Sequence, residues 1–199
     1  MLQLPEAPPI YRILSIDPGS DTLGIALIDV DLCHFTATLV HANTLNATRA
    51  IRQFPFTVET FGERQARLNT HASGLRDYLF SARPHCVISE APYMGRFPQA
   101  FETLVECMYM MRGVVAEYDP SMCMETIDSP SAKKAVGAPG KRPKGMSKEA
   151  YKETVRHGIR ALPKLHLAPG VLIDHCDEHA IDAIAVGCYK VRCIANDIL

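Results

Sequence analysis

SIDPGSDTLGIALID, residues 15–29, is the stretch of sequence that sets the plan of the fold. The apolar run that leads into it stops at Asp17, and Pro18–Gly19 then gives a strong turn signal. A second apolar run follows the turn, so the stretch predicts a β-hairpin whose first strand ends on a carboxylate. Asp is common in turns, so the local sequence favours a turn residue at this position. Only partners elsewhere in the chain can give Asp17 a chemical role.

The composition is that of one ordinary globular domain. The chain has 199 residues, of which 47% are hydrophobic and 22% charged, and its net charge of −1 neither favours nor excludes a nucleic-acid partner. No apolar run reaches the roughly 18 residues of a membrane span, and the start lacks a secretory signal. Seven cysteines without a CxxC pair are typical of reduced core residues in an intracellular, cytoplasmic protein. We expect a single domain over residues 1–199, with residues 1–11 as a flexible extension.

The apolar pattern predicts strands first and then an alternation of helix and strand. Three strands are expected in succession, at residues 12–16, 23–30 and 35–41, and the polar residues 41–56 are expected to form a loop. The later elements are a helix at 61–82, a strand at 86–89, a helix at 98–115, a strand at 122–127, and helices at 147–162 and 180–194. This order is typical of a mixed α/β domain with one central sheet.

Acidic residues stand where such a domain could bring them together. Two predicted apolar strands end on an acid, Asp17 and Glu90. In the C-terminal sequence DHCDEHAIDAIAV, Glu178, His179 and Asp182 share one helix face at i+3 and i+4 spacing. Carboxylates from separate elements can hold hard divalent ions, and two such ions about 4 Å apart support phosphodiester cleavage. Turn formation and helix-dipole complementation stay open as alternatives, whereas the His and Cys spacing fits no common zinc pattern.

Basic residues gather in one segment. Ten of the 21 Lys and Arg residues, but only two acids, lie between Ser129 and Lys164. A localised basic stripe suits a polyanionic partner, and it is equally compatible with a solvated loop and helix face. Within it, GAPGKRPKG has the composition of a mobile loop.

Taken together and in order, these motifs resemble the RuvC family of Holliday-junction resolvases, a branch of the ribonuclease-H-like nucleases. The matching motifs are IDPGS with GIALID, then VISE, then a lysine-rich segment, then HAIDAIAV, and they extend from about Arg12 to about Val191. The resemblance implies a ribonuclease-H-like α/β fold, with a mixed central five-stranded sheet and helices on both faces. It also implies a metal-dependent endodeoxyribonuclease that cuts four-way junctions by paired symmetric incisions.

By position, the resemblance implies a metal site built from Asp17, Glu90, His179 and Asp182. These residues would hold two Mg²⁺ or Mn²⁺ ions at the scissile phosphate. His179 stands where many members of the family carry Asp. Because imidazole is a softer and neutral ligand, we expect Mn²⁺ to support activity at least as well as Mg²⁺.

The resemblance further implies which residues meet DNA. Lys133, with Lys134 as a one-residue alternative, and Lys148 match lysines that the family uses near the phosphate. Tyr93 falls where the family places an aromatic residue that stacks on bases near the junction centre. The residues expected to contact DNA are Tyr93, Lys133, Lys134, Lys141, Arg142, Lys144, Lys148 and Lys152.

The expected partners are branched DNA and a second copy of the chain, with no membrane. Family members act as homodimers, because a two-fold protein matches a two-fold junction. The helix at 98–115 is expected at that interface, although core packing explains its methionines equally well.

Other functions stay under consideration. A broader debranching nuclease, a ribonuclease-H-like nuclease acting on RNA, and a non-catalytic DNA-binding scaffold share most of these features. Actin-like ATPases begin with a similar hairpin, but they need a second comparable domain, for which 199 residues are too few.

Overall fold

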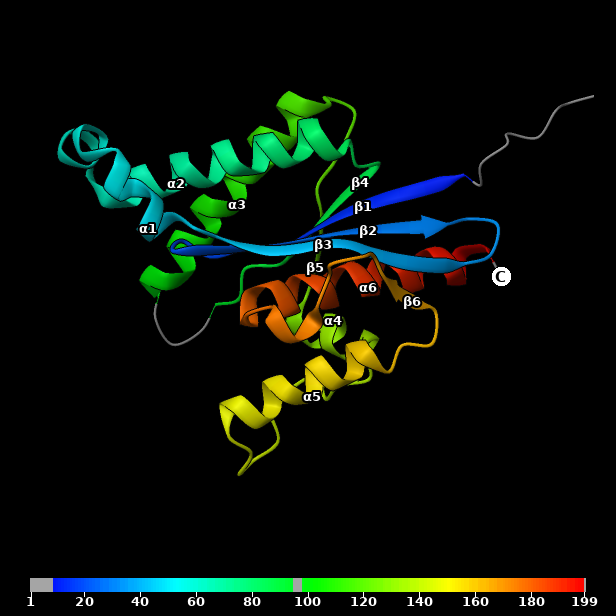
Figure 1. Cartoon of the computed structure of the whole chain (residues 1–199). Coiled ribbons are helices and arrows are strands. Elements are labelled where there is room, and N and C mark those ends of the chain that lie inside the picture. The colour runs from blue at the N-terminus through cyan, green and yellow to red at the C-terminus, as the bar shows by residue number, and fades with distance from the viewer. Residues whose placement is uncertain (1–8, 95–97, 199) are drawn as a thin grey trace, which may run out of the picture.

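Figure 1 shows the computed structural model, which describes residues 9–94 and 98–198. A six-stranded sheet with the order β5-β4-β1-β2-β3-β6 forms its centre. The chain first makes an antiparallel meander, and the later strands pair in parallel, β4 with β1, β5 with β4 and β6 with β3. The strands are β1 (Ile10–Asp17), β2 (Thr22–Asp31), β3 (Thr36–Asn46), β4 (Cys86–Glu90), β5 (Glu125–Ile127) and β6 (Leu165–Leu167).

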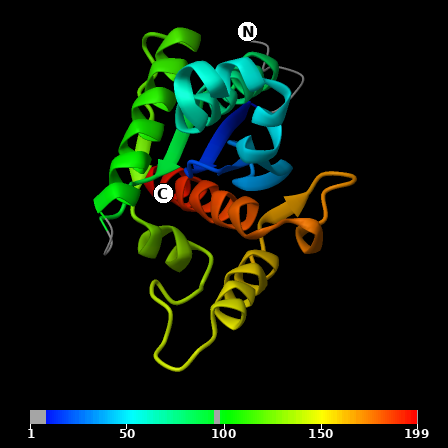
Figure 2. The same cartoon turned by 90° about the vertical axis from the view of Figure 1, so that its left-hand side faces the viewer.

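Helices cover both faces of this sheet. α2 (Pro55–Ala82) and α3 (Pro98–Tyr118) lie on one face, and α6 (Glu178–Ile198) lies on the other (Figure 1). α4 (Ser129–Ala135) and α5 (Lys148–Arg160) pack outside α6, and the loop between them projects away from the sheet (Figure 2). The short elements are α1 (Ala47–Ala50), η1 (Ile51–Gln53) and η2 (Ile173–His175).

Strand alternation decides which face each acid meets. In β1, Leu14 and Ile16 enter the core beneath α2 and α3, whereas Ile13 enters the core beneath α6. Ser15 also faces α6, where its hydroxyl donates to the Ala183 carbonyl oxygen at 2.8 Å. Because successive side chains point to opposite faces, Asp17 lies on the α6 side.

The same alternation holds in β4. Val87 belongs to the core beneath α2 and α3, and Ile88 belongs to the core beneath α6. Glu90 has the parity of Ile88 and therefore also lies on the α6 side. Two strands that neighbour each other in the sheet thus present their terminal acids to the same helix.

Glycines let α6 lie close to the sheet. A Cβ atom on Gly24 of β2 would be only 2.2 Å from the His179 carbonyl oxygen. A Cβ atom on Gly187 of α6 would be 2.6 Å from Ser15 Oγ. Larger residues at these positions would push the helix away, so the two glycines set the depth at which its side chains meet the strand ends.

The α/β class with helices on both faces is confirmed, but the expected number of five strands is wrong. The sixth strand, β6, has only three residues and depends on pairing with Ala37–Leu39, so no local pattern indicates it. The loop expected at 41–56 is also wrong: residues 41–46 continue β3, and α1, η1 and the start of α2 follow. Helix α4 was not predicted either, because its seven residues are too few for a clear period.

Two other expectations concern the chain's start and the methionines of α3. Of the flexible extension expected at 1–11, residues 1–8 lie outside the described part, whereas Ile10 and Tyr11 belong to β1. Met108 and Met111 are buried in the core beneath α2 and α3, which supports the core-packing interpretation for them. Among the described residues, no helix is both long and apolar enough to cross a bilayer.

Candidate active site

Three acids from three elements share one region at the carboxyl ends of β1 and β4. Asp17 and Glu90 each come one residue after Ile16 and Ser89, the last residues through which these two strands pair with each other. Asp182 of α6 lies close enough for its charge to act on Glu90, and the charge of Asp17 acts on Asp182 in turn. The Asp17 side chain is 14% exposed and that of Asp182 is 26% exposed. Water therefore screens the charges of these two carboxylates only in part.

The charges of these acids act on one another. Burial, together with the charges of Asp17 and Asp182, raises the pKa of Glu90 to about 7 against an opposing effect of Lys133. Burial also raises the pKa of Asp182, with a smaller contribution from Asp17. A cluster of carboxylates that disfavours its own ionisation is a site of strong negative potential, which a cation would relieve.

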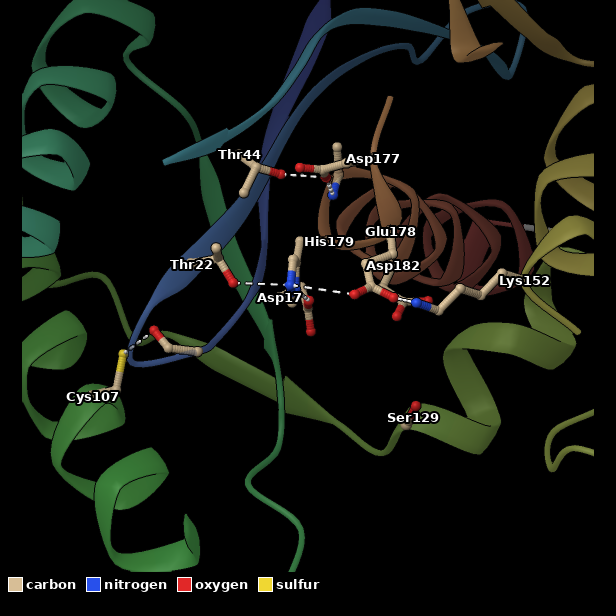
Figure 3. Close-up of polar contacts among 12 residues, drawn as sticks. Asp17, Thr22, Thr44, Cys107, Ser129, Lys152, Asp177, Glu178, His179 and Asp182 are labelled. Carbon is tan, nitrogen blue, oxygen red and sulfur yellow. Dashed lines mark hydrogen bonds and ion pairs between the residues drawn. The ribbon is translucent and has the colours of Figure 1, made fainter. Parts of the chain in front are cut away.

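His179 closes one side of the cluster and is held at both ring nitrogens. Its Nδ1 lies 2.9 Å from Asp17 Oδ2, and its Nε2 lies 2.9 Å from Thr22 Oγ1 (Figure 3). The hydrogen bond with Asp17 raises the pKa of the imidazole, against its partial burial. Because both nitrogens are engaged, His179 can bind a metal only after one of these hydrogen bonds opens. Nothing in the sequence around Thr22 indicated this contact, since it depends on how β2 and α6 pack.

The start of α6 is fixed to the sheet on the other side of His179. Asp177 Oδ1 accepts a hydrogen bond from the Ala180 amide at 3.0 Å, as an N-cap does. The same oxygen accepts one from Thr44 Oγ1 of β3 at 2.5 Å. Asp177 thus caps the start of α6, and its link to β3 sets the direction in which α6 approaches Asp17.

Lys133 is the lysine that reaches the acids. Its Nζ lies 3.7 Å from Asp182 Oδ1 and donates to Ser129 Oγ at 2.7 Å. Ser129 in turn forms a hydrogen bond with Glu90, which opposes a small part of the rise in the pKa of that carboxyl group. Lys134 points elsewhere: it is exposed, and its Cε lies against Gly140. Helix α4, which was not predicted, therefore separates the two lysines that the sequence left as alternatives.

The other predicted DNA-contacting residues stand around this centre rather than in it. Lys152 forms an ion pair with Glu178, and Lys148 Nζ lies 3.6 Å from Glu178 Oε2, so α5 and the start of α6 are joined by charge. Tyr93 is 78% exposed in the segment that follows Glu90. Lys141, Arg142 and Lys144 are exposed on the loop between α4 and α5.

The donor set suits a hard divalent cation. Carboxylate oxygens are the ligands that Mg²⁺ and Mn²⁺ prefer, and Asp17, Glu90 and Asp182 supply them from three elements. As the side chains stand, no three His, Cys, Asp or Glu side chains of the described residues surround a common point. The fit therefore rests on the mutual repulsion of the acids, and the side chains would have to close in to hold an ion.

Comparisons with known proteins place the fold. No protein-family model matches the chain, and no curated protein matches it in sequence. Among solved structures, Thermus thermophilus RuvC is similar with a TM-score of 0.64 and 17% identity, over 94% of this chain and 96% of that one. The yeast mitochondrial Holliday junction resolvase Ydc2 gives 0.58 and 13%, over 96% and 82%. A fowlpox virus resolvase in complex with Holliday junction DNA gives 0.55 and 16%, over 92% and 99%. The expected ribonuclease-H-like, RuvC-like fold is confirmed.

Proposed function

We propose that this chain is a divalent-metal-dependent endonuclease that resolves four-way DNA junctions by paired incisions. The observation that carries the proposal is the meeting of Asp17, Glu90 and Asp182, with Lys133 beside them, on a fold shared with junction resolvases. Acids converge in this way at considerable electrostatic cost, and such a cost is most common at functional sites.

The side chains of the site divide the work of phosphodiester cleavage. Asp17, Glu90 and Asp182 would hold two metal ions, and His179 would join them once one of its hydrogen bonds opens. When bound, the ions would supply an activated water and neutralise charge at the phosphate. Lys133 would donate to a phosphate oxygen, where an ammonium held in a partly buried site stabilises the negative charge that develops during the reaction.

Branched DNA is the substrate that the surroundings of the site favour. The exposed basic residues of the α4–α5 loop would bind phosphates, and Tyr93 offers an exposed ring next to the acid on β4. Two of the similar structures were solved with Holliday junction DNA, those of T. thermophilus RuvC and the fowlpox enzyme. We further propose that the chain works as a homodimer, since a junction has two equivalent strands to cut.

A cleavage assay tests this proposal directly. The protein would be mixed with a synthetic four-way junction, a linear duplex and an RNA/DNA hybrid, each with Mg²⁺, with Mn²⁺ and with EDTA. Paired symmetric nicks in the junction that require a metal are the expected result. Asp17→Asn should abolish cutting and keep binding, whereas the control Asp21→Asn, which changes an exposed acid four residues away, should keep both.

Each alternative function has its own outcome in the same assay. Equal cutting of flaps, forks and junctions would replace resolution by general debranching. Preferential cutting of the hybrid would point to an RNA substrate. Tight junction binding without cutting under any metal condition would make the chain a DNA-binding scaffold.

A further inference from the structure

A cavity lies on the opposite side of the sheet from α6, where the start of α2 folds back on the rest of that helix. Gly62 has left-handed backbone angles, φ 81° and ψ 160°, which divide α2 into two legs. Between Phe54, just before the first leg, and residues 66–74 of the second leg is a cavity of about 380 Å³. This volume lies within the usual range of small-molecule sites, roughly 300–1,000 Å³.

The lining of this cavity combines one aromatic face with neutral hydrogen-bonding groups. Phe54 lies at the edge of the cavity and is 52% exposed, and Asn69, Thr70 and Ser73 line the opposite side of the cavity. In the described part of the chain, no hydrogen bond occupies the Ser73 hydroxyl or the Asn69 amide nitrogen. A flat aromatic group with polar edges suits this lining, because its face can stack on the ring while its edge meets the amide and hydroxyl groups.

The charge next to the cavity favours a group that is attached to a phosphate backbone. The sequence NATRAIRQFPF, residues 46–56, carries Arg49 and Arg52 and no acid. Both arginines are exposed on α1 and η1, immediately before Phe54. Basic residues interleaved with exposed aromatic residues are typical of surfaces that bind unpaired nucleic acid.

The cavity is also linked to the candidate active site through the turn that follows Asp17. The Ala47 amide at the start of α1 donates to the Asp21 carbonyl oxygen at 3.0 Å. On α2, Arg67 Nε lies 3.2 Å from Asp21 Oδ1, and His71 Nε2 lies 3.2 Å from the Ser20 carbonyl oxygen. Figure 1 shows α1 and the start of α2 at the same end of the sheet as the start of α6. DNA bound at the acids would therefore lie at the end of the molecule that carries this cavity.

We propose that the cavity between Phe54 and residues 66–74 of α2 binds an unpaired nucleobase of the branched DNA, stacked on Phe54. This inference rests on the proposed function, and it adds a second base-binding position to the one proposed for Tyr93. The base would leave the stack near the branch point, where pairing is weakest, so that the pocket reads the presence of a branch rather than a sequence.

Affinity measurements on junctions that lack single bases test the pocket. In an Asp17→Asn background, which keeps the strands intact, Kd would be measured for a four-way junction and for junctions with one abasic nucleotide at successive positions near the branch. Stacking of one base corresponds to roughly a 5- to 150-fold change in affinity. Phe54→Ala should weaken binding of the intact junction by a factor in this range. One abasic position should weaken the parent protein equally and leave the Phe54→Ala variant unaffected.

Phe80→Ala is the matched control, because Phe80 is also 52% exposed and lies in α2, the helix that follows Phe54, but outside the cavity. It should bind the intact junction like the parent. Equal affinities of the two variants, or no abasic position that couples to Phe54, would overturn the base pocket while leaving junction binding in place. A parent protein that binds junction and duplex equally would instead overturn the proposed function.

The exposed rings also allow a protein contact, which the same variants can reveal. Phe56 and Phe61, on the first leg of α2, are 74% and 63% exposed. If Phe54→Ala changes the molar mass in light scattering and couples to no base, the surface is an interface between copies, and the nucleobase proposal is overturned. An unchanged mass together with base coupling supports the pocket.

Discussion

Replacement of Gly24 by Ala should impair catalysis as well as stability. Gly24 pairs with Asp17 across β1 and β2, and the first turn of α6 lies directly over it. The new Cβ would be 2.2 Å from the His179 carbonyl oxygen and 2.5 Å from its carbonyl carbon. These are backbone atoms, so no side-chain rotation can remove the clash.

The size of the effect follows from how far the His179 backbone must move away from the new Cβ of residue 24. Real Cβ contacts are essentially never under 3.0 Å, so α6 and β2 must separate by at least about 0.8 Å at His179. That shift moves His179 and Asp182 away from Asp17 and Glu90. A misplacement of about 1 Å can lower a rate about 100-fold, and overpacking of a core typically costs about 1–3 kcal/mol of unfolding free energy. We expect both effects in Gly24→Ala.

Gly187→Ala supplies the matched control in the same helix–sheet interface. Its Cβ would lie 2.6 Å from Ser15 Oγ and 2.7 Å from Ile28 Cδ1, so it overpacks the core similarly but meets side-chain ends. It lies further along α6 than His179 and Asp182. We expect a comparable loss of stability, with cleavage close to that of the wild type.

The assay is single-turnover cleavage of a labelled four-way junction at saturating protein, with urea denaturation of each variant to measure stability. The temperature is chosen so that both variants are fully folded. If Gly24→Ala cuts as fast as Gly187→Ala, the close approach of α6 does not position the acids, and the reasoning is refuted.

Three further predictions concern charge and protonation. Lys133→Ala should slow single-turnover cleavage by about 100-fold or more, because it removes the ammonium group beside the acids. The control Lys134→Ala should weaken junction binding only. Equal cleavage rates in the two variants would contradict this. Burial lowers the pKa of His71 to about 4. Between pH 6.5 and pH 4, His71 is therefore protonated in the unfolded chain and neutral in the folded chain. The unfolding free energy should therefore fall by up to about 3 kcal/mol from pH 7 to pH 4, and urea titrations of His71→Leu should show a flatter profile. Because the pKa of Glu90 is about 7, calorimetry should show Mn²⁺ affinity rising roughly tenfold from pH 6 to pH 8, and a flat profile would exclude Glu90 as a ligand.

Much of the candidate site could be predicted because the alternation of side chains along a strand determines which face of the sheet each acid occupies. An apolar strand that ends on an acid places that acid at the carboxyl end of the strand. Counting back in steps of two from Asp17 or Glu90 reaches a residue in the core beneath α6, Ile13 or Ile88. The i+3 spacing of His179 and Asp182 likewise places both on one side of a helix. These are short-range patterns with a fixed geometry, so a sequence expresses them reliably.

Elements that depend on distant partners could not be predicted in this way. β6 exists because β3 offers it an edge, and residues 41–46 remain in β3 because β2 pairs with them along its whole length. α4 is too short to show a period, although Asp128 caps it by accepting a hydrogen bond from the Ser131 amide. Local propensity is weak in all of these segments, and tertiary pairing outweighs it.

The sequence by itself determined on which side of its strand or helix each of four residues lies, namely Asp17, Glu90, His179 and Asp182, so that these side chains could face one another. Strand and helix periods determine this direction. Only the tertiary structure decided what each of them meets. It set Lys133 rather than Lys134 beside Asp182, engaged both nitrogens of His179, and let α6 come close over Gly24. The physical reason is that direction follows from local backbone geometry, whereas distance between elements follows from packing, which no local pattern contains. The opening hairpin thus placed a carboxylate at a strand end, and packing against a helix more than 150 residues later gave it partners.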